Sequence, residues 1–108
     1  MVFKSERNMQ IHLIVAFLVV IAGSLLNINL IEWCLCLLCF GLVMGAEMVN
    51  TTLENIVDLV SPQKHKLAGK AKDIAAGAVL ITAIVSAIIG LIIFIPKIWV
   101  YISNLFNG

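Results

Sequence analysis

Three long stretches of apolar residues alternate with two short polar segments along the chain. The apolar stretches cover residues 9–31, 33–60 and 70–96. At a rise of about 1.5 Å per residue, about 20 apolar residues cross the hydrocarbon core of a bilayer. The pattern therefore predicts an all-α membrane protein, with three transmembrane helices in a helical bundle and residues 1–108 forming a single integral-membrane domain.

Local signals predict where these helices end. Asn27 and Asn29 favour a turn after the first stretch, and Trp33 follows where an interfacial aromatic is expected. The second helix should stop before Ser61–Pro62, because a residue that precedes proline is biased away from helical geometry. The third apolar stretch is predicted to end at Pro96.

Composition excludes a soluble domain and makes the placement of charge informative. The chain is 62% hydrophobic and 12% charged, with a mean hydropathy of +1.11. Most of its basic residues precede the first stretch or lie between the second stretch and Ile74, where the uncharged part of the third begins: Lys4, Arg7, Lys64, Lys66, Lys70 and Lys72. Because Lys and Arg are enriched in cytoplasmic loops, we expect the N-terminus and the 61–73 loop to be cytoplasmic and the C-terminus external.

Polar side chains interrupt the second apolar stretch along one helical face, which carries Glu47, Asn50, Glu54 and Asp58. An ionisable group at bilayer depth is costly, so such residues turn away from lipid and mark a functional site. A face with several carboxylates also attracts a cation. The alternative is structural: these groups could form a polar clasp between helices that fixes the register of an oligomer.

Small residues within the second and third stretches predict close helix packing, in particular Gly41, Gly45, Gly77 and Gly90. Three helices offer little interior in which to hide polar groups. Both features favour an oligomer.

The order of polar residues resembles the bacterial diacylglycerol kinase family of small three-span lipid kinases. The resemblance rests on Glu47, Asn50, Thr51, Glu54 and Asp58, followed by His65 and by Ala71-Lys72-Asp73. The segment from Glu6 to His12 is similar to the branch that phosphorylates undecaprenol. The family resemblance implies a homotrimer whose active sites lie at the cytoplasmic membrane boundary, with Mg²⁺-ATP as donor and a membrane lipid alcohol as acceptor.

The same resemblance implies roles for individual residues. Glu47 matches the catalytic base, Glu6 and Glu54 match the metal-binding pair, and Asn50 and Asp58 are supporting members of the signature. The nucleotide-binding positions are Glu6, Glu54, Gln63, Lys64, His65, Lys72 and Asp73. His12 is expected to be a membrane-boundary residue and not a ligand. Since this chain reaches Glu6 so soon after its start, the surface helix that opens most family members is expected to be largely absent.

These inferences predict an ATP-dependent lipid kinase of the bacterial plasma membrane, with undecaprenol as acceptor and undecaprenyl phosphate as product. The alternatives are a diacylglycerol kinase that makes phosphatidic acid and a non-catalytic short form that acts in membrane assembly. A small transport or ion-conducting oligomer is less favoured, because its charges would lie near the midplane and its sequence often shows repeats or broken helices. No nucleic-acid partner is expected.

Overall fold

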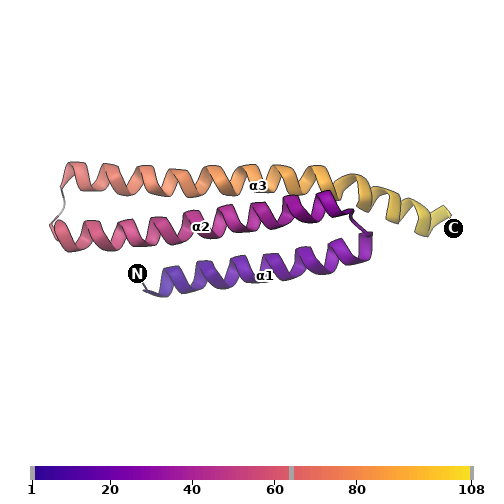
Figure 1. Ribbon diagram of the computed structural model, residues 1–108, viewed down its shortest axis with the longest axis horizontal. Helices are drawn as coiled ribbons and strands as arrows, with labels where there is room; N and C mark the ends of the chain where they lie inside the picture. The colour runs from indigo at the N-terminus through magenta and orange to yellow at the C-terminus, as the bar shows by residue number, and fades with distance from the viewer. Residues whose placement is uncertain (1, 64, 108) are drawn as a thin grey trace.

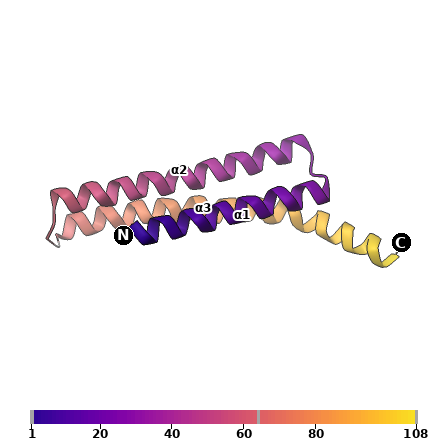
Figure 2. The same cartoon turned by 90° about the horizontal axis from the view of Figure 1, so that it is seen from below.

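Three helices make up the described part of the chain. The computed structural model describes residues 2–63 and 65–107, with side chains for 7–63 and 65–107. The helices are α1 (Val2–Leu26), α2 (Leu30–Val60) and α3 (Lys66–Asn107), and they run antiparallel to their chain neighbours (Figures 1 and 2). The α2 and α3 helices pack together extensively, whereas α1 contacts both of them less. Each helix is long and apolar enough to cross a membrane, which confirms the predicted all-α architecture with three apolar helices.

Local hydrogen bonds hold the turn between α1 and α2. Asn27 adopts a left-handed conformation (φ 53°), and the N–H of Ile28 donates to the carbonyl of Gly23 at 3.1 Å. This is the Schellman arrangement that ends many helices. Asn29 then caps α2: its side chain accepts from the N–H of Glu32 at 2.9 Å, and the Glu32 carboxylate accepts from the N–H of Asn29 at 3.0 Å. The two asparagines thus form the turn that the sequence predicts.

The connection between α2 and α3 is also held by local hydrogen bonds. The α2 helix ends at Val60, before Ser61–Pro62 as expected, and the N–H of Ser61 donates to the carbonyl of Val57 at 2.8 Å. His65 precedes the first residue of α3, and its Nδ1 accepts from the N–H of Leu67 at 3.2 Å. His65 therefore caps the N-terminus of α3.

The α3 helix does not end at Pro96 but continues to Asn107. Proline lacks an N–H, so its bond to the carbonyl of Ile92 is missing, and helices tend to kink where this happens. In Figure 1 the last part of α3, drawn in yellow, bends away from the axis of the rest. Just after Pro96, Lys97 forms an ion pair of 3.0 Å with Glu32 at the start of α2. This ion pair connects α2 and α3 beside the bend.

The helix bounds also differ from the predicted spans at other ends. The α1 helix begins at Val2 and ends at Leu26, whereas the sequence predicts a span over residues 9–31. Likewise, α3 begins at Lys66, whereas the sequence predicts a span that begins at residue 70. The apolar pattern marks the part of a helix that suits lipid, while hydrogen bonding and capping decide where the helix itself ends.

Little of the chain is buried within one copy. Among the described residues, the buried apolar side chains are Ile28, Val43 and Ile93, and the buried polar ones are Glu47 and Asn50. Val43, Glu47 and Asn50 follow one another at intervals of a helical turn on α2 and so share one face. Most large apolar side chains are exposed, as expected where lipid or another protein surface surrounds the helices.

The glycine with the nearest neighbouring atoms is Gly23, which is not among the small residues of the second and third apolar stretches. A Cβ atom at Gly23 of α1 would lie 2.7 Å from Cη2 of Trp33 on α2. A Cβ at Gly41, Gly45, Gly77 or Gly90 would have no neighbour within 4 Å. Within a single copy, these four glycines are therefore not places of close helix approach, and the predicted approach is left to contacts between copies. Gly41 and Gly45 are exposed, whereas Gly77 and Gly90 are partly buried.

Candidate active site

Glu47 is the most buried carboxylate of the described residues, with 8% of its surface exposed. It lies on α2, between Val43 and Asn50 on the buried face. Burial of a charged carboxylate is costly unless hydrogen bonds compensate it. The surroundings of Glu47 therefore decide what this group can do.

Two side chains of α1 supply those contacts. Asn8 Nδ2 lies 3.4 Å from Glu47 Oε1, and His12 Nε2 lies 3.4 Å from Glu47 Oε2. Asn8 and His12 are four residues apart, which places them on one face of the helix. His12 is thus more than the membrane-boundary residue expected from sequence. The i, i+4 spacing of two polar residues next to an apolar stretch was the signal that could have revealed this face.

One turn further along α2, Asn50 and Glu54 form a second polar pair. Asn50 Nδ2 donates to Glu54 Oε1 at 2.9 Å, while the Oδ1 atom of Asn50 is buried and has no hydrogen-bond partner among the described residues. A carboxylate beside an amide oxygen that lacks a hydrogen-bond partner is a donor set that suits Mg²⁺, which prefers oxygen ligands. The predicted metal pair also requires Glu6, whose side chain lies outside the described residues. Among the described side chains, no group of three or more His, Cys, Asp or Glu residues gathers that could hold a metal ion.

Asp58 and Lys72 connect the same end of α2 to α3. Their side chains form an ion pair, and both are about one-third exposed. The ion pair brings together two residues of the predicted signature that are far apart in sequence. It also balances the charge of Lys72, which was predicted to contact a nucleotide.

The remaining predicted nucleotide-binding positions lie near the connection between α2 and α3. Gln63, His65 and Asp73 are exposed, and His65 uses Nδ1 to cap α3. Lys64 lies outside the described residues.

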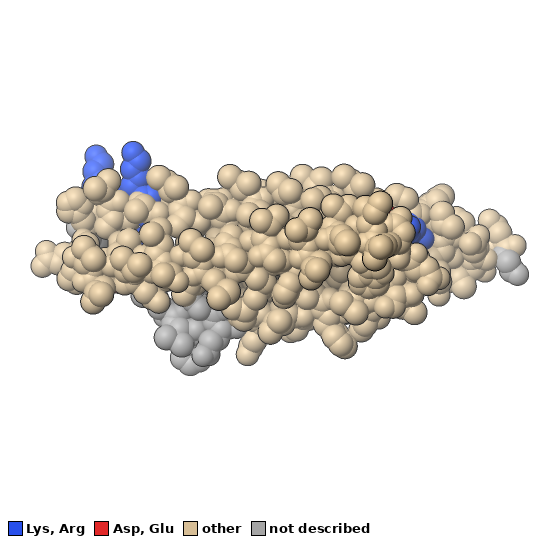
Figure 3. Space-filling view, in the orientation of Figure 1, with Lys and Arg blue, Asp and Glu red and all other residues tan. Residues whose placement is uncertain are grey.

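Basic side chains occur toward both ends of the face shown in Figure 3, with uncharged surface between them. Exposed Lys66 and Lys70 belong to the first turns of α3, close to the ion pair of Lys72 with Asp58. Several charged groups that a phosphate-bearing ligand could contact thus lie at one end of the bundle.

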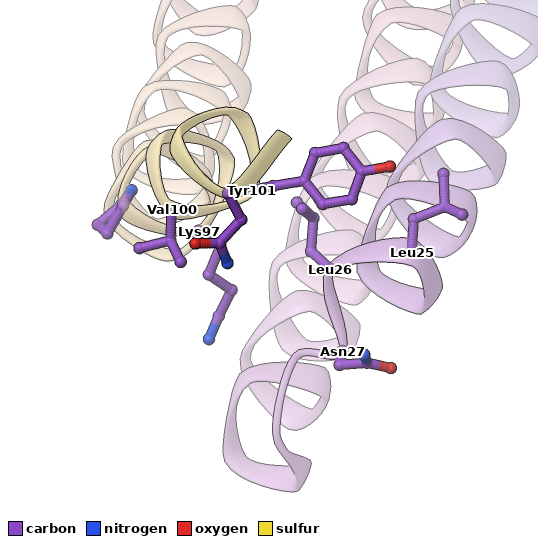
Figure 4. Close-up of a pocket in the computed structure, with 8 residues that line it drawn as sticks. Leu25, Leu26, Asn27, Lys97, Val100 and Tyr101 are labelled. Atoms are coloured by element: carbon purple, nitrogen blue, oxygen red, sulfur yellow. The ribbon is translucent and has the colours of Figure 1, made fainter. Parts of the chain in front are cut away.

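A hollow lies at the opposite end of the bundle. Its volume is about 470 Å³, and it is lined in part by the residues labelled in Figure 4: Leu25, Leu26, Asn27, Lys97, Val100 and Tyr101. None of the predicted site residues lines it. This hollow is therefore separate from the candidate active site.

Comparison with known proteins decides the family. The family model described as "Prokaryotic diacylglycerol kinase" matches residues 1–94. The chain belongs to the prokaryotic diacylglycerol kinase family. Within it, the chain is 46% identical over 94 residues to the undecaprenol kinase of Bacillus subtilis (strain 168), covering 87% of this chain and 76% of that relative. No solved structure matches.

Other similar members carry the name diacylglycerol kinase. The protein of Synechocystis sp. is 43% identical over 95 residues, which are 87% of this chain and 54% of that relative. The protein of Escherichia coli (strain K12) is 35% identical over 75 residues, which are 69% of this chain and 62% of that relative. The chain thus spans between about half and three-quarters of the length of these relatives. Membership confirms the predictions of a membrane protein and a lipid kinase, with ATP as the phosphoryl donor.

Proposed function

We propose that this family member transfers the γ-phosphoryl group of ATP to the hydroxyl of undecaprenol, giving undecaprenyl phosphate. The observation that carries the proposal is the buried carboxylate of Glu47, which lies on the same α2 face as Asn50 and Glu54. The choice of undecaprenol is supported by the similarity to the Bacillus undecaprenol kinase. Diacylglycerol is the second candidate acceptor, because the Synechocystis diacylglycerol kinase is nearly as similar.

In the proposed reaction Glu47 acts as the general base. The acceptor hydroxyl oxygen forms a bond to the γ-phosphorus as the bond from that phosphorus to the bridging oxygen of ADP breaks, and the hydroxyl proton moves to Glu47. The acceptor is a lipid whose hydroxyl stays at the membrane interface, so its base must lie at the same depth. A general base must also come within hydrogen-bonding reach of the proton that it takes.

Glu54 and Asn50 are proposed to face the phosphates. At the usual rise per residue, Asn50 lies about 4.5 Å and Glu54 about 10 Å along α2 from Glu47. Together with Glu6, Glu54 would hold Mg²⁺, which neutralises phosphate charge when bound. Gln63, Lys64, His65, Lys72 and Asp73 are the proposed nucleotide contacts. To reach a phosphate, Lys72 would have to share its ammonium group with Asp58 or leave it.

We also propose that the chain works as a homotrimer with its active sites on the cytoplasmic side of the membrane. The support is the small interior of one copy and the exposed glycines Gly41 and Gly45 on α2. Polar groups at membrane depth need partners, which a second copy can supply.

The decisive test is a phosphoryl-transfer assay on the purified full chain in lipid-detergent micelles. Undecaprenol and diacylglycerol are offered separately with γ-labelled ATP and Mg²⁺, and the labelled lipid is measured. We expect label in undecaprenol at a higher kcat/KM than in diacylglycerol. The reverse ranking would establish diacylglycerol as the acceptor, and the absence of label in either lipid from an assembled protein would favour the non-catalytic form.

A further inference from the structure

The proposed reaction gives no role to the two α1 side chains that contact Glu47. Among the described side chains, each of its two carboxylate oxygens has one nitrogen contact, and both nitrogens belong to α1. Asn8 meets Oε1 and His12 meets Oε2, so the carboxylate plane is fixed by two points on a neighbouring helix. A glutamate held by a single contact would keep freedom about its terminal torsion.

His12 is suited to this contact by its placement. The imidazole is partly shielded, with 26% of its side-chain surface exposed, whereas 11% of the Glu47 side chain is exposed. With the proton on Nε2, a neutral imidazole donates to Oε2; a protonated ring would donate there as well. In either state it stabilises the ionised carboxylate that a base requires.

We propose that His12 is a positioning residue for Glu47, holding the carboxylate of the base through Nε2 in the orientation that receives the hydroxyl proton. The inference rests on the proposed function and extends it to α1. Asn8 completes the arrangement from one helical turn earlier. Because each carboxylate oxygen has two lone pairs, one contact per oxygen leaves acceptor capacity for the lipid hydroxyl.

A positioning role for His12 predicts a specific effect of its substitution on kcat and KM. Displacement of a catalytic group by about 1 Å can reduce the rate by about 10²-fold, so His12→Ala should lower kcat by that order. The KM for ATP should stay unchanged, because most of the proposed nucleotide contacts lie in the connection after α2 and on α3, and Glu6 lies more than one helical turn from His12 along α1. His12→Gln should restore most of kcat, since its amide N–H₂ can donate to the same oxygen.

The experiment compares the wild type, His12→Ala and His12→Gln in the lipid assay, with the oligomer mass measured on each preparation. Gln10→Ala is the matched control, because Gln10 is an exposed polar residue of α1 between Asn8 and His12. We expect the control to retain wild-type kcat. A purely structural role for His12 would reduce activity in proportion to the loss of the oligomer, and the glutamine variant would then give no selective recovery of kcat.

Two results would overturn the inference. The first is an unchanged kcat in His12→Ala; the second is a loss of kcat that His12→Gln does not recover although both variants assemble. Failure of the proposed function gives a different result, since the wild type itself would then label neither lipid. In that case the result would disprove both the proposed reaction and the positioning role of His12.

Discussion

At the scale of single residues, the central question is whether Glu47 performs chemistry or only joins two helices. Its contacts to Asn8 and His12 are compatible with both roles, because a polar clasp between α1 and α2 would use the same atoms. The two roles differ in their need for a proton acceptor. A clasp needs only hydrogen-bonding groups, whereas a base needs a carboxylate.

Glu47→Gln separates these roles. The amide keeps the size of the side chain and one oxygen acceptor but is not a base, so we expect kcat to fall by about 10²- to 10⁴-fold. The affinity for Mg²⁺-ATP and the oligomer mass should stay as in the wild type, because the nucleotide contacts are proposed elsewhere. Turnover, nucleotide binding and mass are measured on the same preparation. An active, assembled Glu47→Gln protein would remove Glu47 from the reaction.

Glu54 should affect a different quantity. Glu54→Gln removes one anionic oxygen from the proposed Mg²⁺ site, so the Mg²⁺ concentration needed for half-maximal activity should rise and nucleotide affinity should fall. Asn55→Ala is the matched control, because Asn55 is the exposed neighbour of Glu54 on α2. Equal Mg²⁺ dependence in Glu54→Gln and the control would contradict a role for Glu54 as a ligand.

At the scale of elements, the turn between α1 and α2 depends on the left-handed conformation of Asn27. A side chain without a short polar group costs about 1–2 kcal/mol in that conformation, whereas glycine adopts it readily. Asn27→Ala should therefore destabilise the protein by about 1 kcal/mol, and Asn27→Gly should be neutral or stabilising. The measurement is unfolding in mixed detergent followed by circular dichroism. Equal stability of the two variants would show that the turn does not depend on this residue.

The ends of helices could be predicted from sequence where the signals are local. Asn27 and Asn29 mark a turn because their short side chains cap backbone groups, and Ser61–Pro62 stops α2 because proline restricts the residue before it. Pro96 marks the predicted end of the third apolar span but not the end of α3, since a helix can continue past a proline with a kink when only one hydrogen bond is lost. The apolar pattern alone does not distinguish a kink from an end.

Contacts between helices could not be predicted in the same way. The signature placed Glu47, Asn50 and Glu54 on one face of α2, but it carried no information about which face of α1 lies opposite. The contact of His12 with Glu47 depends on the rotation of α1 about its axis, which is set by packing such as that of Gly23 against Trp33. The ion pair of Asp58 with Lys72 likewise needs the register of two helices.

At the scale of the whole molecule, the proposed orientation can be tested by labelling. In a background without Cys34, Cys36 and Cys39, a cysteine introduced at Gln63 should resist an impermeant thiol reagent in intact cells, because the 61–73 loop is expected to be cytoplasmic. A cysteine introduced at Asn104, near the other end of α3, should react. Reversed labelling of the two positions would invert the topology and place the nucleotide contacts on the wrong side for cellular ATP.

The closed turn between α1 and α2 has a consequence for biogenesis. A backbone group without a partner costs several kcal/mol inside a bilayer, which hinders the translocation of most loops. Here the N–H of Ile28 is bonded to Gly23 and the N–H groups of Asn29 and Glu32 are bonded within the capping box. The turn can therefore cross the bilayer at a lower cost than a loop whose backbone groups have no hydrogen-bond partners.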